Sequence, residues 1–243
     1  MMVHWVISAR NEFVWTMSIV FSLLSLTTFL FGCQSVRHSG ELEYTGGASL
    51  ESFSSNASLS YVTTDRSISG SGILMYRKPE QIRAVILSPF GSVLQEVYVS
   101  GEQVTIIDSG NGTVFSGSYE DLPVKGDLSG WRNIHWLIDI DPPESSRHTA
   151  VIERINKYGH QETAAFENGF LISKKTFLGG QVRYGRYITV RGVPFPLEII
   201  YETNAKEKFT ILFEDPEINV SLADGTFIPD LSKYRVFPLS ILR

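Results

Sequence analysis

Residues 164–172 read Ala-Ala-Phe-Glu-Asn-Gly-Phe-Leu-Ile, with two short apolar runs on either side of Asn168-Gly169. Asn and Gly both tolerate the positive φ of a type I′ turn, so this pair is the strongest short-range signal of a β-hairpin. The same arrangement continues in both directions, because strand-like runs alternate with short turns. The sequence therefore predicts an antiparallel sheet, since parallel neighbours need connections of about a dozen residues or more.

Further strands are expected on both sides of this hairpin. After it, strands are predicted at residues 182–190, 197–201 and 209–213, with turns at Gly179-Gly180, Arg191-Gly192 and Asn204-Ala205. Before it, strands are predicted at residues 73–76, 84–87, 94–99 and 104–107, with turns at 78–80, 88–91 and 100–101. In residues 209–213, Phe209, Ile211 and Phe213 share one face of the strand. The fold is expected to be mainly β, with about ten strands.

One segment between the two blocks of strands has helical periodicity. Trp131, Ile134, His135 and Ile138 share a helix face, since their spacing is i, i+3, i+4, i+7. Asp127 or Ser129 is a candidate N-cap, and Pro142-Pro143 would end the helix. Residues 149–158 fit a second helix and a strand equally well. A sheet that bends around an apolar helix forms an incomplete antiparallel β-barrel with a short helical lid.

The first 32 residues have the pattern of a secretory signal peptide. Residues 14–31 carry no charge, Arg10 precedes them, and Gly32 closes the segment before Cys33. A basic start, an apolar middle and a small residue before the cleavage site are typical of such signals. Met17 is an alternative start that would remove Arg10. An N-terminal membrane anchor helix is the alternative interpretation, because the uncharged run is long enough to be a transmembrane candidate.

Cys33 favours a lipoprotein signal. It is the only cysteine in the chain, and a lone thiol in an exported protein needs an explanation other than an internal disulfide. Leu30, Gly32 and Cys33 resemble the bacterial lipobox, which implies diacylglycerol on the sulfur of Cys33 and a third acyl chain on its amino group. Stable anchoring needs more than one acyl chain. Gln34 after the cysteine resembles the signal of lipoproteins sent to the outer membrane, where the protein would face the periplasm.

The remaining chain is expected to comprise a tether and one domain. Residues 33–49 are polar, contain glycine and lack apolar periodicity, so they read as a flexible tether. Residues 50–243 read as a single β domain. The chain has a formal net charge of −5, and Arg10 cancels Glu12 within the signal, so the mature part keeps this charge. A negative domain is not expected to bind nucleic acid, nor to adhere electrostatically to anionic lipids.

No pattern in the sequence indicates catalysis. The five histidines, at positions 4, 38, 135, 148 and 160, lack metal-ligand spacing, and one cysteine cannot supply a usual zinc site. There is no Gly-x-Ser-x-Gly motif and no phosphate-binding glycine loop. Asp139 and Asp141 are two residues apart, so they would not share a helix face. We expect a protein that is not an enzyme and that has no metal or other cofactor.

Several segments together resemble a known family. Residues 87–92 (Leu-Ser-Pro-Phe-Gly-Ser), residues 114–117, and Trp131 with residues 135–138 and Pro142 resemble the LolB family of outer-membrane lipoproteins, within the LolA/LolB lipoprotein-localisation superfamily. Residues 187–199 look like the Tyr-containing strand, turn and Pro-containing strand of these domains. Phe213, Asn219 and Leu222, before Phe227, look like their closing segment. The resemblance covers roughly residues 59–227 and rests on order and spacing.

The resemblance implies a fold and a function. The incomplete barrel would enclose a hydrophobic cavity that receives acyl chains of other lipoproteins from a periplasmic LolA-like carrier and releases them into the outer membrane. The loop Pro89-Phe90-Gly91 would place this cargo in the membrane. The helical lid of the cavity would be formed by Trp131, Ile134, Trp136, Leu137 and Ile138.

The chain also departs from this family. Residues 44–54 offer only Leu50 and Phe53 where LolB-type proteins carry an early amphipathic helix, and the chain continues through residues 230–243. An alternative function is therefore a structural or assembly lipoprotein of the outer membrane. Such a protein would use the same fold to bind a protein partner or another lipid.

Replacing Cys33 with Ala should block lipidation and leave an unprocessed precursor, held in the membrane by its apolar N-terminus. Mass spectrometry of the wild-type N-terminal peptide checks this expectation, because two or more acyl chains should add to the mass of Cys33. An unmodified thiol at Cys33 in the wild-type protein would contradict the lipoprotein interpretation.

Overall fold

The computed structural model describes residues 45, 47–124, 128–140, 149–176 and 179–242. The signal peptide, Cys33, most of the expected tether, Asp127, Asp141 and Pro142-Pro143 lie outside the described residues. All of these residues belong to the compact unit Leu42–Arg243. Within the described residues, no helix combines the length and the hydrophobicity that crossing a membrane requires.

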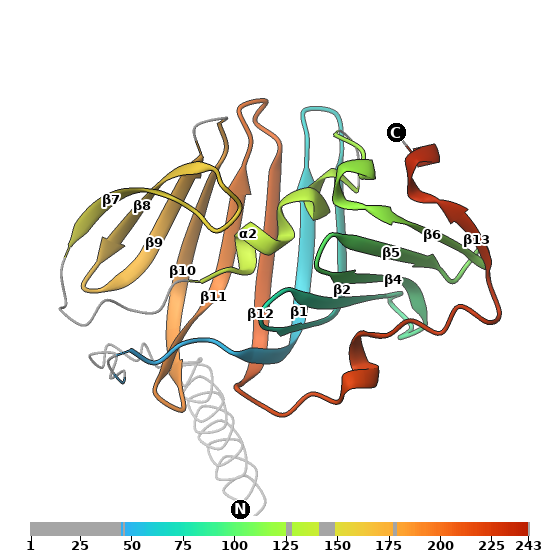
Figure 1. Cartoon of the computed structure of the whole chain (residues 1–243), viewed down its shortest axis with the longest axis horizontal. Coiled ribbons are helices and arrows are strands. Elements are labelled where there is room, and N and C mark those ends of the chain that lie inside the picture. Colours follow the sequence, from blue (N-terminus) through green and yellow to red (C-terminus); the bar gives the residue numbers. More distant parts are fainter. Residues whose placement is uncertain (1–44, 46, 125–127, 141–148, 177–178, 243) are drawn as a thin grey trace, which may run out of the picture. The chain divides into compact units, whose positions relative to one another are not determined.

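The described strands form one open sheet of thirteen strands, in the order β13-β6-β5-β4-β3-β2-β1-β12-β11-β10-β9-β8-β7 (Figure 1). Neighbouring strands are antiparallel except β13, which runs parallel to β6. The expected mainly β fold class is confirmed: the described residues form one open sheet with one short α-helix, and the sheet has more strands than the ten or so expected. The bounds are β1 Ser52–Val62, β2 Ser67–Arg77, β3 Gln81–Leu87, β4 Val93–Ser100, β5 Gln103–Asp108, β6 Thr113–Ser118, β7 Ala150–Ile155, β8 Gln161–Glu167, β9 Phe170–Thr176, β10 Gln181–Val190, β11 Val193–Glu202, β12 Lys208–Ile218 and β13 Arg235–Pro238.

Two tight turns formed as their residues predict. Asn168 and Gly169 have φ values of 50° and 83°, and Glu167 pairs with Phe170 across the two-residue loop between β8 and β9. Arg191 and Gly192 have φ values of 52° and 78° and connect β10 to β11 in the same way. Positive φ at both central residues is the geometry of a type I′ hairpin.

Strand β1 was not among the expected strands, and it joins the two halves of the sheet. It pairs with β2 on one side and with the distant β12 on the other. Small polar residues interrupt the apolar positions of β1, so it lacks the continuous apolar run that marks a buried strand. The alternation expected in β12 is confirmed, because Phe209, Ile211 and Phe213 are buried. We call the sheet face that carries these three side chains the inner face.

The expected helix is present in a shorter and less regular form. A 3-10 turn, η2, spans Ser129–Asn133, and the α-helix α2 spans Ile134–Ile138. Asn133, with φ −112° and ψ 6°, breaks the helical geometry between them. Figure 1 shows this segment lying across the sheet. Residues 149–158, which fitted a helix or a strand, form the edge strand β7 and the turn after it.

The end of the expected tether is held against the domain where it is described. The amide N–H of Thr45 donates to the carbonyl oxygen of Gly192 at 3.0 Å. The side-chain amide of Asn219 donates to the carbonyl oxygen of Ser49 at 3.1 Å. Ala48 packs against the core. The described end of the expected tether is therefore part of the domain.

Three phenylalanines from the central strands form an aromatic cluster in the core. Phe53 of β1 lies 5.3 Å from Phe195 of β11 and 5.5 Å from Phe213 of β12, measured between ring centroids. The rings of Phe195 and Phe213 lie 5.0 Å apart. The contacts are edge-to-face, the arrangement that aromatic pairs prefer. Phe53 has no exposed surface, so its ring contributes fully to the core.

Replacing Phe53 with Ala should lower the free energy of unfolding by about 3–5 kcal/mol, because the ring leaves a cavity between three strands. Urea unfolding at neutral pH measures the loss. Phe90→Ala is the matched control: Phe90 is 96% exposed, and its truncation should change stability by no more than about 0.5 kcal/mol. Equal losses in the two variants would contradict the described core.

Candidate functional site

The inner face of β1–β6 bears an open-sided cavity of about 790 Å³. The ends of β1 and β2 next to the turn that connects them line the cavity, and so do the ends of β3 and β4 next to their connecting loop. Residues of β5 and β6 also contribute. Leu128, Trp131, Phe209 and Leu242 complete the lining. Most of the lining is apolar, and the volume falls within the range of roughly 300–1,000 Å³ that is typical of ligand sites. The cavity therefore suits an apolar ligand.

Small residues in β2 leave this space open. Ser69, Gly70 and Ser71 of β2 contribute little bulk to the lining, whereas β3 and β5 contribute the large apolar residues Ile86 and Ile106. A Cβ atom at Gly70 would already lie 3.3 Å from the side chain of Ile86. At Gly72, a Cβ atom would lie 1.9 Å from the carbonyl oxygen of Val85, so β2 and β3 can approach this closely only with glycine there.

The five residues expected to form the lid lie in two different environments. Trp131 borders the cavity, together with Leu128 just before it. Ile134, Leu137 and Ile138 have no exposed surface and pack in the main core, and Trp136 is 7% exposed. None of these four is among the residues lining the cavity. In the structure these four side chains therefore pack as core residues.

Polar side chains of the β8–β10 strands hold the end of α2 in place. The ammonium of Lys174 donates to the carbonyl oxygens of Trp136 at 2.8 Å and of Asp139 at 2.7 Å. The hydroxyl of Tyr184 donates to the carbonyl oxygen of Leu137 at 3.0 Å. The last carbonyls of a helix lack partners within the helix, and a cation there is favourable. These hydrogen bonds fix the C-terminal end of α2.

Lys174 is a contributor that the sequence pattern did not reveal. It is 1% exposed, and its ammonium lies 5.5 Å from the ring centre of Trp136 and 5.7 Å from that of Tyr184. If side chains of β9 alternated strictly between the two faces of the sheet, Lys174 would lie on the face opposite to the buried Leu171. The pairing of β8 with β9 shifts register, however, with Ala165 opposite Ser173 and Phe166 opposite Leu171. This bulge turns Lys174 inward.

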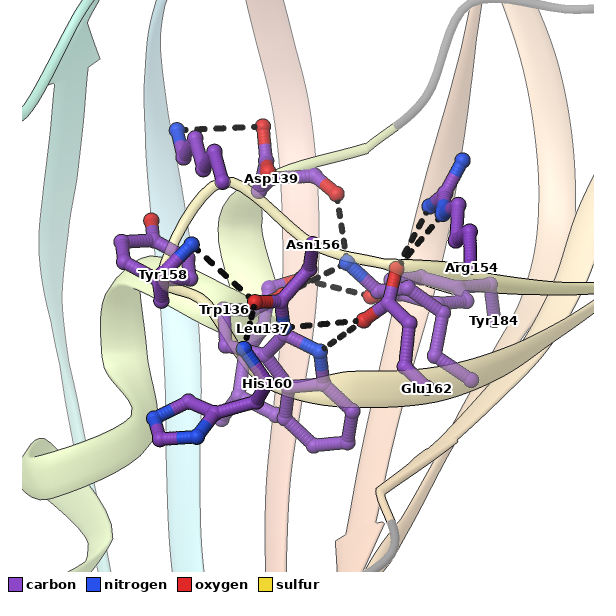
Figure 2. Close-up of polar contacts among 11 residues, drawn as sticks. Trp136, Leu137, Asp139, Arg154, Asn156, Tyr158, His160, Glu162 and Tyr184 are labelled. Atoms are coloured by element: carbon purple, nitrogen blue, oxygen red, sulfur yellow. Dashed lines mark hydrogen bonds and ion pairs between the residues drawn. The ribbon is translucent and has the colours of Figure 1, made fainter.

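Glu162 of β8 is the anionic centre of the same polar cluster (Figure 2). Its carboxylate accepts from the indole N–H of Trp136 at 2.7 Å and from Asn156 at 3.2 Å. It also forms an ion pair with Arg154 at 2.7 Å. Burial raises the pKa of Glu162, but the hydrogen bonds from Trp136, Arg154 and Asn156 and the charge of Lys174 outweigh it and hold the pKa below its usual value. Glu162 is therefore a buried, satisfied carboxylate.

The loop between β3 and β4 presents Phe90 to solvent, as expected from Pro89 and Gly91. The hydroxyl oxygen of Ser88 accepts from the amide N–H groups of Phe90 at 3.3 Å and Ser92 at 3.0 Å. Gly91 has a φ of 82°, a conformation that favours glycine. Phe90 is 96% exposed, whereas Pro89 next to it belongs to the cavity lining.

Apolar side chains surround this loop at the margin of the cavity. Ile68, Val93 and Leu94 are 40%, 40% and 48% exposed, and Ile68 and Leu94 also line the cavity. Leu87, the last residue of β3, pairs with Ser71 and with Val93, so the loop after it leaves the sheet beside the end of β2 that carries Ile68. We call Ile68, Phe90, Val93 and Leu94 the apolar rim.

Asp139 and His135, two titratable residues at α2, have structural partners. Asp139 forms an ion pair with Lys157 at 3.4 Å, and Asp141 lies outside the described residues. The Nε2 atom of His135 lies 3.3 Å from the carbonyl oxygen of Gly101, and burial lowers the pKa of this histidine. Over the described ranges, no group of three or more His, Cys, Asp or Glu residues is placed to hold a metal ion.

No protein-family model matches the chain, and no curated protein matches it. Several solved structures share its fold, including the following three. A LolA superfamily protein from Nitrosomonas europaea matches with a TM-score of 0.54 and 17% identity, over 75% of this chain and 92% of that one. A DUF1329 family protein from Desulfovibrio piger matches with a TM-score of 0.55 and 14% identity, over 74% and 90%. A domain assigned to an outer-membrane lipoprotein-sorting protein from Vibrio parahaemolyticus matches with a TM-score of 0.53 and 7% identity, over 73% and 89%.

The domain has a LolA-like fold. Identities this low show the architecture alone, and they do not single out LolB within it. The expected incomplete β-barrel of the LolA/LolB type is thereby confirmed as a fold.

Replacing Glu162 with Gln should destabilise the LolA-like domain by about 1–3 kcal/mol at pH 7, because buried donors lose a charged acceptor. The folded-state pKa of Glu162 is lowered, so its stabilisation is present above the ordinary value of 4.5 and is lost as the pH falls through the folded-state pKa. The difference in the free energy of unfolding between the wild type and Glu162→Gln should therefore become smaller as the pH falls. Urea unfolding between pH 7 and pH 3 measures it.

Glu167→Gln, at an exposed position of the same strand, is the matched control and should leave the pH profile unchanged. If the Glu162→Gln and wild-type profiles stayed parallel down to pH 3, the charged carboxylate would not be the stabilising form.

Proposed function

We propose that this LolA-like domain binds acyl chains of other lipoproteins in its cavity and helps insert them into the outer membrane. The observation that carries the proposal is the open-sided apolar cavity of about 790 Å³, with the fully exposed Phe90 beside it. No chemical step is needed for such a function, since transfer requires only binding and release. The protein is accordingly proposed to be a carrier and not an enzyme.

The energetics of the lining favour an acyl chain. Burial of each methylene group in an apolar environment contributes roughly 0.8 kcal/mol. Most of the lining residues are apolar and make no polar demand on a ligand, and the polar ones include the small residues Ser69 and Ser71. Asp108, which also lines the cavity, is already engaged because its carboxylate accepts from Asn111 at 2.7 Å. A charged or strongly polar ligand would find few partners there.

The apolar rim suggests how the cargo leaves. Phe90 can enter the boundary between headgroups and acyl chains, and full burial of its ring would contribute roughly 1.5–3 kcal/mol. Pro89 joins the exposed ring directly to the cavity lining, so insertion of the loop brings the mouth of the cavity to the bilayer. We propose that Pro89, Phe90 and Gly91 form the membrane-insertion loop, with Ile68 and Leu94 as further contacts.

The cellular setting in the proposal comes from the sequence and from the fold. The lipobox-like segment that ends at Cys33 supports a lipid anchor in the outer membrane, with the domain facing the periplasm. The shared fold of a LolA superfamily protein and of a lipoprotein-sorting domain supports a role in lipoprotein localisation. A periplasmic LolA-like carrier is the proposed donor of the cargo. Trp131, which borders the cavity, is the proposed remnant of a lid.

A second candidate function rests on how much of the inner face is filled. The aromatic cluster around Phe53 and the buried residues of α2 occupy the face over the central strands. A domain packed in this way could serve as a structural or assembly lipoprotein that binds a protein partner or another lipid. Delivery distinguishes the two, because only the carrier should take up the acyl chains of a lipoprotein and pass them to a membrane.

A soluble form that starts after Cys33 contains the whole compact unit from residue 42 onward and can test the proposal. Native mass spectrometry should detect acyl-bearing lipid bound to this form. Loaded protein should then deliver a lipoprotein to vesicles of phosphatidylethanolamine and phosphatidylglycerol. Phe90→Glu should bind cargo as the wild type does but deliver it at least about tenfold more slowly, since a carboxylate resists burial in hydrocarbon.

Phe90→Leu is the matched control and should keep most of the delivery rate, because it restores an apolar tip. If Phe90→Glu delivered cargo at the wild-type rate, the loop would be an ordinary turn and the insertion step would be wrong. If the wild-type protein retained no lipid, the carrier function itself would be wrong and the second candidate would stand.

A further inference from the structure

The segment after β12 passes from one face of the sheet to the other. Leu231 and Tyr234 pack on a small cluster of Tyr98, Ile107 and Val114, which is separate from the main core. Leu239 belongs to the main core on the inner face. Between them, β13 pairs in parallel with β6 at the edge of the sheet (Figure 1). The chain therefore wraps around the β6 edge and arrives beside the cavity.

A close approach between β6 and the residues after β13 fixes the position of the C-terminal segment. The 3-10 turn η4, Leu239–Leu242, follows β13 directly. A Cβ atom at Gly117 of β6 would lie 2.8 Å from the Cβ of Leu239, so η4 can sit this close only because position 117 is glycine. Leu239 has no exposed surface, and the ring of Phe237 lies 6.1 Å from that of Phe115. These contacts hold η4 against β6.

The geometry of η4 sends one side chain into the cavity and its neighbour to solvent. In a 3-10 turn, side chains three residues apart lie on the same side. Leu242 therefore follows Leu239 toward the inner face, where it joins the cavity lining with Phe115 and Ile106. Ile241, one residue earlier, is 56% exposed and is not among the lining residues.

We propose that Leu242 sets the length of acyl chain that the cavity admits. The inference rests on the proposed function, since it assigns a specificity to the same cavity. The other walls near Leu242, at Ile106 and Phe115, belong to strands with neighbours bonded on both sides. Leu242 instead projects from a four-residue turn, so its volume can change without disturbing the sheet. Space taken by this side chain is space that an acyl chain cannot fill.

The expected effect follows from burial of methylene groups. Affinity for saturated fatty acids should rise about fourfold with each added methylene until the cavity is full, and should then level off. We call the chain length at which the affinity stops rising the levelling point. Leu242→Ala removes three carbon atoms, so the levelling point should move to chains longer by about two or three methylenes. For the longest chains, the gain over wild type should reach on the order of 50-fold. Leu242→Trp should move the levelling point to shorter chains.

The test uses the soluble form that starts after Cys33 and saturated fatty acids from eight to eighteen carbons, below their micelle concentrations. Displacement of a cavity-bound fluorescent fatty acid gives an affinity for each length, and a melting curve accompanies each variant. Ile241→Ala is the matched control and should leave the levelling point where the wild type has it. Leu242→Ala enlarges the cavity and Leu242→Trp reduces it. A shift of the levelling point can therefore be measured even if only one of the two variants folds.

The outcomes separate this inference from the proposed function. Opposite shifts in the two Leu242 variants, with none in Ile241→Ala, would support the assignment. Fatty-acid binding by the wild type with an unmoved levelling point in both variants would overturn the role of Leu242 alone. Absence of fatty-acid binding by the wild type would overturn the acyl-binding function and the inference together.

Discussion

The antiparallel pairing of β1 with β12 is the contact on which the rest of this domain depends. Residues about 150 positions apart meet there, with Leu59 opposite Ile211 and Tyr61 opposite Phe209. The pairing joins β2–β6 to β7–β11 in one sheet and brings together the aromatic cluster of Phe53 and Phe213. It also builds one wall of the cavity, because Leu59, Tyr61 and Phe209 belong to its lining.

The same pairing positions the segment that crosses the inner face. The hydroxyl of Ser129 donates to the phenol oxygen of Tyr61 at 3.1 Å, and Gly130 lies against the ring of Phe209. At the other end, Lys174 and Tyr184 bind the carbonyl oxygens at the end of α2. A segment held at both ends needs no long helix to remain in place. Its middle is therefore free to serve as core, and its beginning to border the cavity.

An apolar void in a folded domain carries a cost, because its lining side chains lose contacts that a packed core would provide. In this domain the void coincides with a run of serine and glycine in β2, with an exposed apolar rim and with Leu242 supplied from beyond the sheet edge. A core under selection for stability alone would fill this space with apolar side chains. In the proposed function, binding of an acyl chain gives this absence of packing a physical reason, and the apolar rim gives the acyl chain a route to a bilayer.

The features that the sequence determined by itself are local ones. Asn168-Gly169 and Arg191-Gly192 predict turns because positive φ depends on those residues alone, and alternation in residues 209–213 predicts which side chains of β12 are buried. Pro89 and Gly91 likewise predict an exposed Phe90. The tertiary structure alone decided that β1 pairs with β12, that a bulge turns Lys174 inward, that most of the expected lid is core, and that Leu242 reaches the cavity. Each of these depends on contacts between segments far apart in the chain, and neither turn chemistry nor periodicity within one segment carries information about its distant neighbour.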